Sequence, residues 1–165
     1  MQQNLNFDIV IVGGGIVGLS LARSLQLSGL KLALIDGIPT PPVPEQRDLK
    51  SPKFDSRVSA LTVSSQKIME ALVIWEKILL SHPCHYEEME VWDREGTGSI
   101  YFSAAEIHQP RLGYIIENRV ILSALSEAVE DQENLKLFKP DKLIALNPIE
   151  STISSDQRQD SEGKY

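Results

Sequence analysis

Four glycines near the start of the chain have the spacing of a turn that binds phosphate. In the sequence G-G-G-I-V-G, the residues Gly13, Gly15 and Gly18 form the pattern G-x-G-x-x-G. The first glycine permits a tight turn, the second lets the backbone approach a pyrophosphate, and the third lets a helix pack closely on a strand. This spacing indicates a site for a dinucleotide.

The helix expected after the turn and an acidic residue further along complete the predicted site. Where a helix begins, its first N–H groups and the positive end of its dipole favour an anion, so no lysine is required. Asp36 lies about 20 residues beyond the turn, where a carboxylate accepts hydrogen bonds from an adenosine ribose. The residues predicted to contact the cofactor are Gly13, Gly14, Gly15, Ile16, Val17, Gly18 and Asp36.

A strand, a helix and a second strand must hold these residues in place. Residues 9–12 are apolar, like a buried parallel strand, and lead directly into the turn. Apolar residues at helical spacing follow, Gly29 is expected to end the helix, and residues 30–35 predict a second buried strand. This β-α-β order argues against the glycines being only a flexible turn. The alternative that Asp36 is a mere surface charge stays open.

The composition indicates a folded domain and argues against some partners. The chain has 165 residues, 42% of them hydrophobic, and a net charge of −7 without a basic cluster, which speaks against a nucleic-acid surface. A single cysteine, Cys84, excludes an internal disulfide framework, and no apolar run is long enough to span a bilayer. We expect an intracellular protein with one domain over residues 1–150 and a polar tail over residues 151–165.

The chain changes character twice after Asp36. Residues 37–55 contain five prolines and mixed charges, which predicts a long surface loop, either a solvated connector or a flap beside the cofactor. Apolar residues at helical spacing then predict a helix over residues 64–80, with Thr62 or Ser64 as its N-cap.

From Tyr86 onward, apolar and polar residues alternate as they do in strands. The pattern turns at residues 96–98 and resumes through Phe102, so it predicts a β-hairpin. The aromatic residues of this hairpin fit either a substrate wall or an antiparallel sheet that covers a core, and the pattern leaves both open.

Residues 112–131 begin as a strand and become an amphipathic helix at about Asn118. Arg119 falls in the first turn of this helix, where a cation is mildly unfavourable. We therefore expect Arg119 to face an anion or a carboxylate; the alternative is an ordinary surface arginine. Residues 134–138 and 143–146 predict two further strands.

No catalytic residue and no metal site can be named from the sequence. His82, Cys84 and His85 are crowded into four residues without a second ligand pair, which does not make a four-ligand zinc site. No arrangement of serine, histidine and acid supports hydrolysis, and no general acid or base has a defensible position. The catalytic residues are unknown at this level.

Several strings, taken in order, resemble one family of enzymes. They are the turn with Asp36, D-S-R-V-S-A-L at residues 55–61, W-E-K-I at residues 75–78 and L-G-Y-I-I-E-N-R at residues 112–119. Over roughly residues 5–148, the chain resembles the flavin-dependent hydroxylases of ubiquinone biosynthesis, which are class A aromatic monooxygenases. The second and fourth strings are much more specific than the glycine turn.

The resemblance implies a Rossmann-like α/β fold with a parallel sheet and an inserted antiparallel layer. It implies FAD bound by the glycine turn and Asp36, with Arg57 and Arg119 against the cofactor, because guanidinium groups complement phosphate oxygens. A salt bridge to a surface carboxylate is the alternative for Arg57. The implied reaction hydroxylates the ring of a polyprenylated phenol with O₂ and NAD(P)H, and the nicotinamide visits transiently. The implied location is the cytoplasm, with peripheral contact to the inner membrane or to a quinone-biosynthesis complex.

Two departures from the family pattern bear on these expectations. Val73 stands where the family commonly has glycine, which removes an easy left-handed helix end. Family members are also more than twice as long, so the chain is expected to be catalytically incomplete by itself. The alternatives are another FAD oxidoreductase, such as an amine oxidase, and a nucleotide-binding scaffold without catalytic activity.

Overall fold

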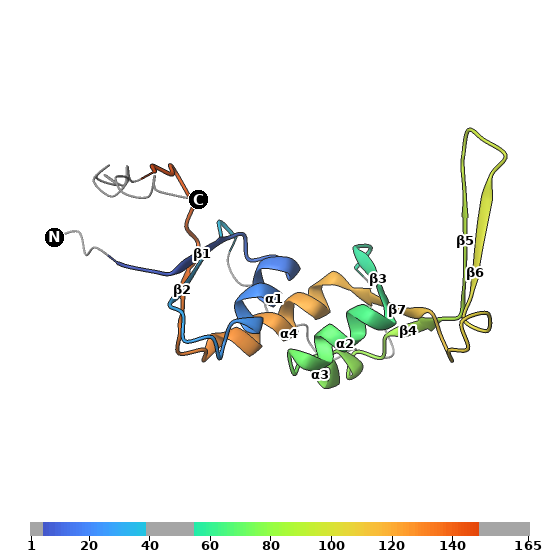
Figure 1. Ribbon diagram of the computed structural model, residues 1–165, viewed down its shortest axis with the longest axis horizontal. Coiled ribbons are helices and arrows are strands. Elements are labelled where there is room, and N and C mark those ends of the chain that lie inside the picture. The colour runs from blue at the N-terminus through green and yellow to red at the C-terminus, as the bar shows by residue number, and fades with distance from the viewer. Residues whose placement is uncertain (1–4, 39–54, 149–165) are drawn as a thin grey trace, which may run out of the picture.

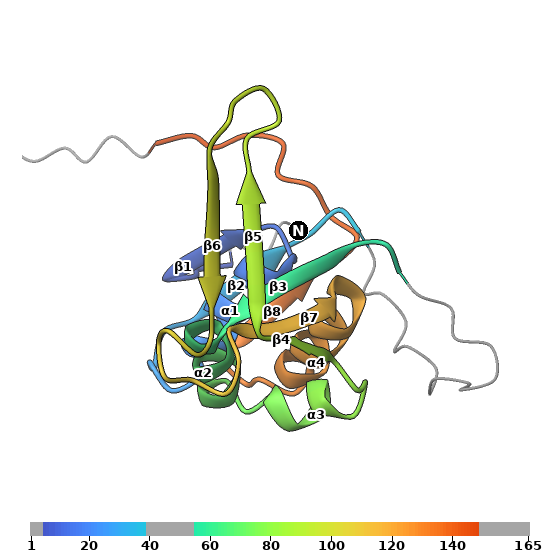
Figure 2. The ribbon, with the colours of Figure 1, turned by 90° about the vertical axis from the view of Figure 1, so that its right-hand side faces the viewer.

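The computed structural model describes residues 5–38 and 55–148 of the chain. They form an α/β fold with one parallel sheet, one antiparallel sheet and one separate hairpin. The parallel sheet lies at one end, the helices lie in the middle, and the hairpin projects from the opposite end (Figures 1 and 2). The predicted loop over residues 37–55 lies almost wholly outside the described residues, as does all of the predicted tail. No helix among the described residues is long and apolar enough to cross a membrane.

The strand, helix and strand that the sequence predicts are present as two neighbouring strands of the parallel sheet and the helix that connects them. Its strands, in spatial order, are β1 (Ile9–Val12), β2 (Leu32–Ile35) and β8 (Leu135–Phe138). The helices on it are α1 (Ile16–Ser24) and α4 (Asn118–Glu130). Ile11 and Leu34 of the sheet share one buried core with Leu19 of α1 and Leu125 of α4. Burial of these apolar faces holds the two helices on one face of the sheet.

The two helices run side by side in the same direction. Each leads into a strand of the parallel sheet, α1 into β2 and α4 into β8. Their C-terminal ends are tied together: Arg23 Nη1 donates to the carbonyl of Ala128, and Gln132 Nε2 donates to the carbonyl of Ala22, both at 2.9 Å. Both helix N-termini therefore point to the edge of the sheet at which the parallel strands end.

The antiparallel sheet lies next to the helices. Its strands, in spatial order, are β3 (Val58–Thr62), β7 (Gly113–Glu117) and β4 (Cys84–Tyr86). Between β3 and β4 the chain forms α2 (Val63–Ala71) and α3 (Trp75–Leu79). Thr62 caps α2 as predicted, because its hydroxyl oxygen accepts from the N–H of Ser65 at 3.3 Å. Trp75 packs edge to face on Tyr114, with ring centroids 5.2 Å apart, and so joins α3 to β7.

The predicted hairpin is confirmed as two strands, β5 (Glu88–Trp92) and β6 (Ser99–Ser103). Its cross-strand pairs give it one apolar face, whose members are 39–60% exposed; they are Met89, Val91, Ile100 and Phe102. One of the two sequence interpretations expected this hairpin to cover a core. Within the described residues it covers none. The other interpretation, a substrate wall, stays a prediction.

One predicted helix end and one predicted strand are wrong. α1 ends at Ser24 rather than near Gly29, because the hydroxyls of Ser24 and Ser28 each donate to the carbonyl three residues earlier and favour a turn. Gly29, with φ +73°, lies in the following loop. Residues 143–146 form no strand: after β8 the N–H of Asp141 still donates to the carbonyl of Asp36 at 3.0 Å, but residues 143–146 join no sheet in the described part.

The helix predicted over residues 64–80 is also wrong in its continuity, because α2 and α3 are separate. The break has the hydrogen bonds of a Schellman motif: the N–H of Val73 donates to the carbonyl of Glu70 at 2.9 Å, and that of Ile74 to Met69 at 3.1 Å. Val73 adopts φ +61°, so the left-handed helix end is kept without glycine. A β-branched residue is strained in this region.

Replacing Val73 with glycine is expected to raise the free energy of unfolding by about 1 kcal/mol, because it relieves this strain. Little packing is lost in exchange, since Val73 is 79% exposed. Urea denaturation of the parent and of V73G measures this difference in the free energy of unfolding. Val73→Ala is the control, because it keeps the Cβ atom and most of the strain. A V73G protein less stable than the parent would contradict the assigned backbone conformation.

Candidate dinucleotide-binding site

The glycine turn follows β1 and is held by the neighbouring strand. Gly13 adopts φ +108°, which favours glycine, and its N–H donates to the carbonyl of Ile35 at 2.8 Å. A Cβ atom on Gly18 would lie 2.0 Å from the carbonyl oxygen of Gly13. The first and third glycines are therefore required by the local fold itself.

The second glycine of the pattern has a different environment. Gly15 is the N-cap of α1 with an ordinary φ of −76°, and a Cβ atom there would meet no other atom within 4 Å. The first N–H groups of an α-helix have no partner within the helix, and the N-cap residue Gly15 has no side chain that could bind them. The space beside Gly15, in front of the positive end of α1, thus fits an anionic group of a ligand.

Asp36 lies directly beside the turn. It follows β2, and its N–H donates to the carbonyl of Phe138 at 3.0 Å. A Cβ atom on Gly14 would lie only 2.4 Å from Asp36 Oδ2, so the carboxylate and the glycine backbone are in close contact. The other oxygen, Oδ1, accepts from the N–H of Ile38 at 3.2 Å. The structure therefore brings the predicted phosphate turn and the predicted ribose acceptor together.

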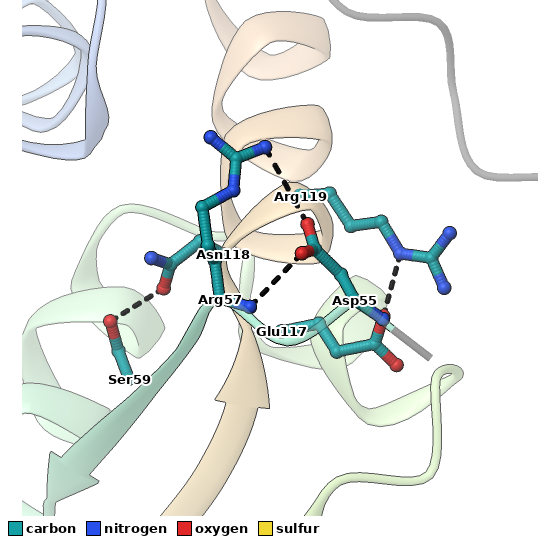
Figure 3. A network of polar contacts seen from close by, with 6 residues as sticks. All are labelled: Asp55, Arg57, Ser59, Glu117, Asn118 and Arg119. Carbon is teal, nitrogen blue, oxygen red and sulfur yellow. Dashed lines mark hydrogen bonds and ion pairs between the residues drawn. The ribbon is translucent and has the colours of Figure 1, made fainter. Parts of the chain in front are cut away.

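The two predicted arginines belong to a second cluster, at the ends of β3 and β7 (Figure 3). Arg119 Nε donates to Glu117 Oε2 at 2.6 Å, and the same oxygen accepts from the N–H of Asp55 at 3.0 Å. The guanidinium of Arg57 lies 3.7 Å from Asp55 Oδ2. Arg119 thus faces a carboxylate, as expected. The ion pair that was the alternative interpretation of Arg57 is also present.

The pairing of β3 with β7 also brings the members of this cluster together. The N–H of Asn118 donates to the carbonyl of Arg57 at 2.9 Å, and Ser59 Oγ donates to Asn118 Oδ1 at 2.5 Å. Arg57 and Arg119 are consequently held on adjacent segments. The side chain of Arg57 is 81% exposed, so it is accessible to a ligand.

Asp55 is a carboxylate at neutral pH. Its Oδ1 accepts from the N–H of Arg57 at 3.0 Å, and this hydrogen bond is the main cause that holds the pKa of Asp55 below its usual value. The charges of Arg57 and Arg119 lower the pKa further, while partial desolvation acts in the opposite direction. The loss of this charge is expected only in acid, below the ordinary range of aspartate.

The turn and the arginine cluster lie on different sheets but face the same way. α1 begins just after the turn, α4 begins at Asn118 with Arg119 in its first turn, and the two helices run in the same direction. The sequence interpretation missed four members of the arginine cluster, although their strings were singled out; they are Asp55, Ser59, Glu117 and Asn118. No group of three metal-ligating side chains occurs among residues 5–38 and 55–148.

Comparison with curated proteins finds relatives over most of the chain. It is 36% identical over 141 residues to 3-demethoxyubiquinol 3-hydroxylase of Escherichia coli, a match that covers 85% of this chain and 34% of the relative. It is 32% identical over 134 residues to the mitochondrial ubiquinone biosynthesis monooxygenase COQ6 of Danio rerio, covering 78% of this chain and 26% of the relative. The chain therefore spans about a quarter to a third of the length of these relatives.

Solved structures show the same fold. The flavin-dependent monooxygenase PieE, in complex with FAD and substrate, matches with a TM-score of 0.56 and 16% identity over 83% of this chain and 24% of its own. A variant of Pseudomonas aeruginosa PqsL matches with a TM-score of 0.56 and 16% identity over 80% and 33%. No protein-family model matches the chain. Over most of its length, the chain is thus a homologue of ubiquinone-biosynthesis hydroxylases.

Proposed function

We propose that the chain binds FAD, with the pyrophosphate at the N-terminus of α1 and the adenosine ribose at Asp36. The observation that carries this proposal is the open space beside Gly15, next to a turn against which Asp36 is packed. A pyrophosphate carries negative charge, and the helix N-terminus supplies N–H donors and a positive dipole end for it. The residues present therefore fit the adenosine diphosphate part of the cofactor.

Arg57 and Arg119 are proposed to lie against the same cofactor. Both guanidinium groups belong to the cluster at the start of α4, which points to the same side as α1. Asp55 and Glu117 partly neutralise the positive charges of Arg57 and Arg119, so the arginines do not form an uncompensated positive patch. Planar guanidinium donors suit phosphate and flavin oxygens by geometry as well as by charge.

The reaction proposed for the functional unit is hydroxylation of the aromatic ring of a polyprenylphenol in ubiquinone biosynthesis, with NAD(P)H and O₂ as co-substrates. Bound FAD would supply the redox chemistry of oxygen transfer. The chain's own residues would bind and orient the cofactor. The names of the relatives support this reaction over that of an amine oxidase. A hydrophobic prenyl substrate also suggests peripheral contact with a membrane or a biosynthetic complex.

We further infer that residues 1–150 are the FAD-binding part of a larger functional unit. Val10 and Val12 on β1 are 51% and 58% exposed, whereas parallel sheets are ordinarily covered on both faces. The apolar face of the hairpin is exposed as well, and an isolated hairpin is marginally stable in water. Both observations favour additional polypeptide over these surfaces when the enzyme is active.

Flavin analysis followed by an activity assay tests the proposal. The protein is purified from its natural source; one aliquot is heated to release flavin, and a second, unheated aliquot is assayed for NADPH oxidation and for hydroxylation of a prenylphenol by mass spectrometry. We expect FAD and a product that is heavier by one oxygen atom. Absence of flavin, also after incubation with FAD, would favour the scaffold without catalytic activity and contradict the proposal. Flavin without hydroxylation would support the cofactor and contradict the reaction.

A further inference from the structure

Glu117 occupies a position for which its side chain is unusual. It is the N-cap residue of α4, where serine, threonine, aspartate and asparagine are preferred, and its side chain does not cap its own helix. The side chain is only 9% exposed. A buried carboxylate is costly unless it is paired and hydrogen-bonded, so its partners explain why it is there.

Those partners join two segments that are far apart in the sequence. One oxygen of Glu117 accepts both from Arg119 Nε, at 2.6 Å, and from the N–H of Asp55, at 3.0 Å. Asp55 in turn accepts from the N–H of Arg57 and lies near its guanidinium. A single carboxylate oxygen thus connects the segment before β3 with the first turn of α4 (Figure 3).

We propose that Glu117 is a positioning residue for the cofactor site, which fixes Arg119 and the segment carrying Arg57 relative to one another. This inference rests on the proposed binding of FAD. A guanidinium is planar, so a hydrogen bond to Nε determines the direction in which its two Nη groups point. The hydrogen bond to Asp55 similarly fixes the backbone from which the Arg57 side chain extends.

A purely electrostatic role and a positioning role for Glu117 predict changes of opposite sign in the affinity for FAD. If Glu117 were only a negative charge near an anionic cofactor, its neutralisation would strengthen FAD binding, because a repulsive charge is removed. If Glu117 positions the arginines, its neutralisation weakens FAD binding, because the donors are no longer held in one arrangement. The sign of the change in affinity therefore decides between the two roles.

The test compares Glu117→Gln with Glu127→Gln in the 165-residue chain. Glu127 is a matched control, because it lies on the same helix, pairs with Lys77 on the surface and gives the same change in net charge. Titration with FAD, followed by flavin fluorescence, measures the dissociation constant. We expect E117Q to raise it about tenfold and E127Q to leave it within about twofold. An E117Q protein that binds FAD as tightly as the parent, or more tightly, overturns the inference.

Two further variants separate positioning from folding and from charge. Glu117→Asp keeps the charge but shortens the side chain, so we expect it to weaken FAD binding too, with a thermal transition that shows a folded protein. In an Arg119→Ala background, E117Q should have less than half of its effect on the logarithm of the dissociation constant, because the two residues act together. Independent effects would contradict the inference. No FAD binding by the parent chain would instead contradict the proposed function.

Discussion

Replacing Gly18 with alanine is expected to lower the free energy of unfolding by about 3 kcal/mol, since overpacking against backbone is not easily relieved. The added Cβ atom would lie 2.0 Å from the carbonyl oxygen of Gly13 and 3.3 Å from Ile11 Cγ2. Neither α1 nor β1 can move away without disturbing the core that they share. Helix propensity alone predicts the opposite, a gain of about 1 kcal/mol for alanine within a helix.

Urea denaturation of G18A beside Gly98→Ala measures this effect. Gly98 lies at the hairpin, and a Cβ atom there would meet nothing within 4 Å, so G98A is expected to change stability by about 0.5 kcal/mol or less. If G18A proved as stable as the parent, the close approach of α1 to the glycine turn would be wrong.

Replacing Gly15 with alanine is expected to weaken FAD binding at least about 100-fold, because the methyl group would occupy space proposed for the pyrophosphate. The same change is expected to cost only about 1 kcal/mol of stability, as for a modest loss at an N-cap. Gly15 has an ordinary φ, and a Cβ atom there touches no other atom within 4 Å. Gly15 and Gly18 therefore separate the function of the turn from its role in folding.

Thermal unfolding and FAD titration of G15A, measured on the same preparation, test this separation. A folded G15A protein with the parent's affinity for FAD would show that the pyrophosphate lies elsewhere. A G15A protein that unfolds like G18A would show that the space beside Gly15 is needed by the fold.

The elements around the glycine turn could be predicted because their signals are local. Strand, turn, helix and acidic strand end follow one another from residue 9 to Asp36, and each residue's role depends on near neighbours. The single break between α2 and α3 could not be predicted from propensity. Val73 is a poor residue for a left-handed helix end, and burial of Ile74 and Trp75 on the core maintains it there.

The exposed hairpin shows a different limit of sequence patterns. Alternation of apolar and polar residues correctly predicts two strands and one apolar face, but it does not say what covers that face. Residues 143–146 also have the pattern of a strand. A strand in a sheet requires a partner strand as well, and the pattern does not supply one. Partners come from topology, which the local pattern does not contain.

The candidate site could be predicted in its residues but not in its connections. Arg57 and Arg119 were named from their strings, while the hydrogen bond between Asp55 and Glu117 joins residues 62 positions apart. That bond depends on the register of β3 with β7, in which Val58 lies opposite Glu117. The supporting role of Glu117 therefore became visible only once the two strands were paired.

We propose above all that this chain recognises the adenosine diphosphate part of FAD. Calorimetric titration of the parent chain with FAD and, separately, with FMN tests it most directly, because FMN lacks both the bridging diphosphate and the adenosine. We predict one FAD bound per chain with a dissociation constant on the order of 1 μM or below, and FMN bound at least about 100-fold more weakly. Equal affinity for the two flavins, or no binding of FAD, would contradict the account.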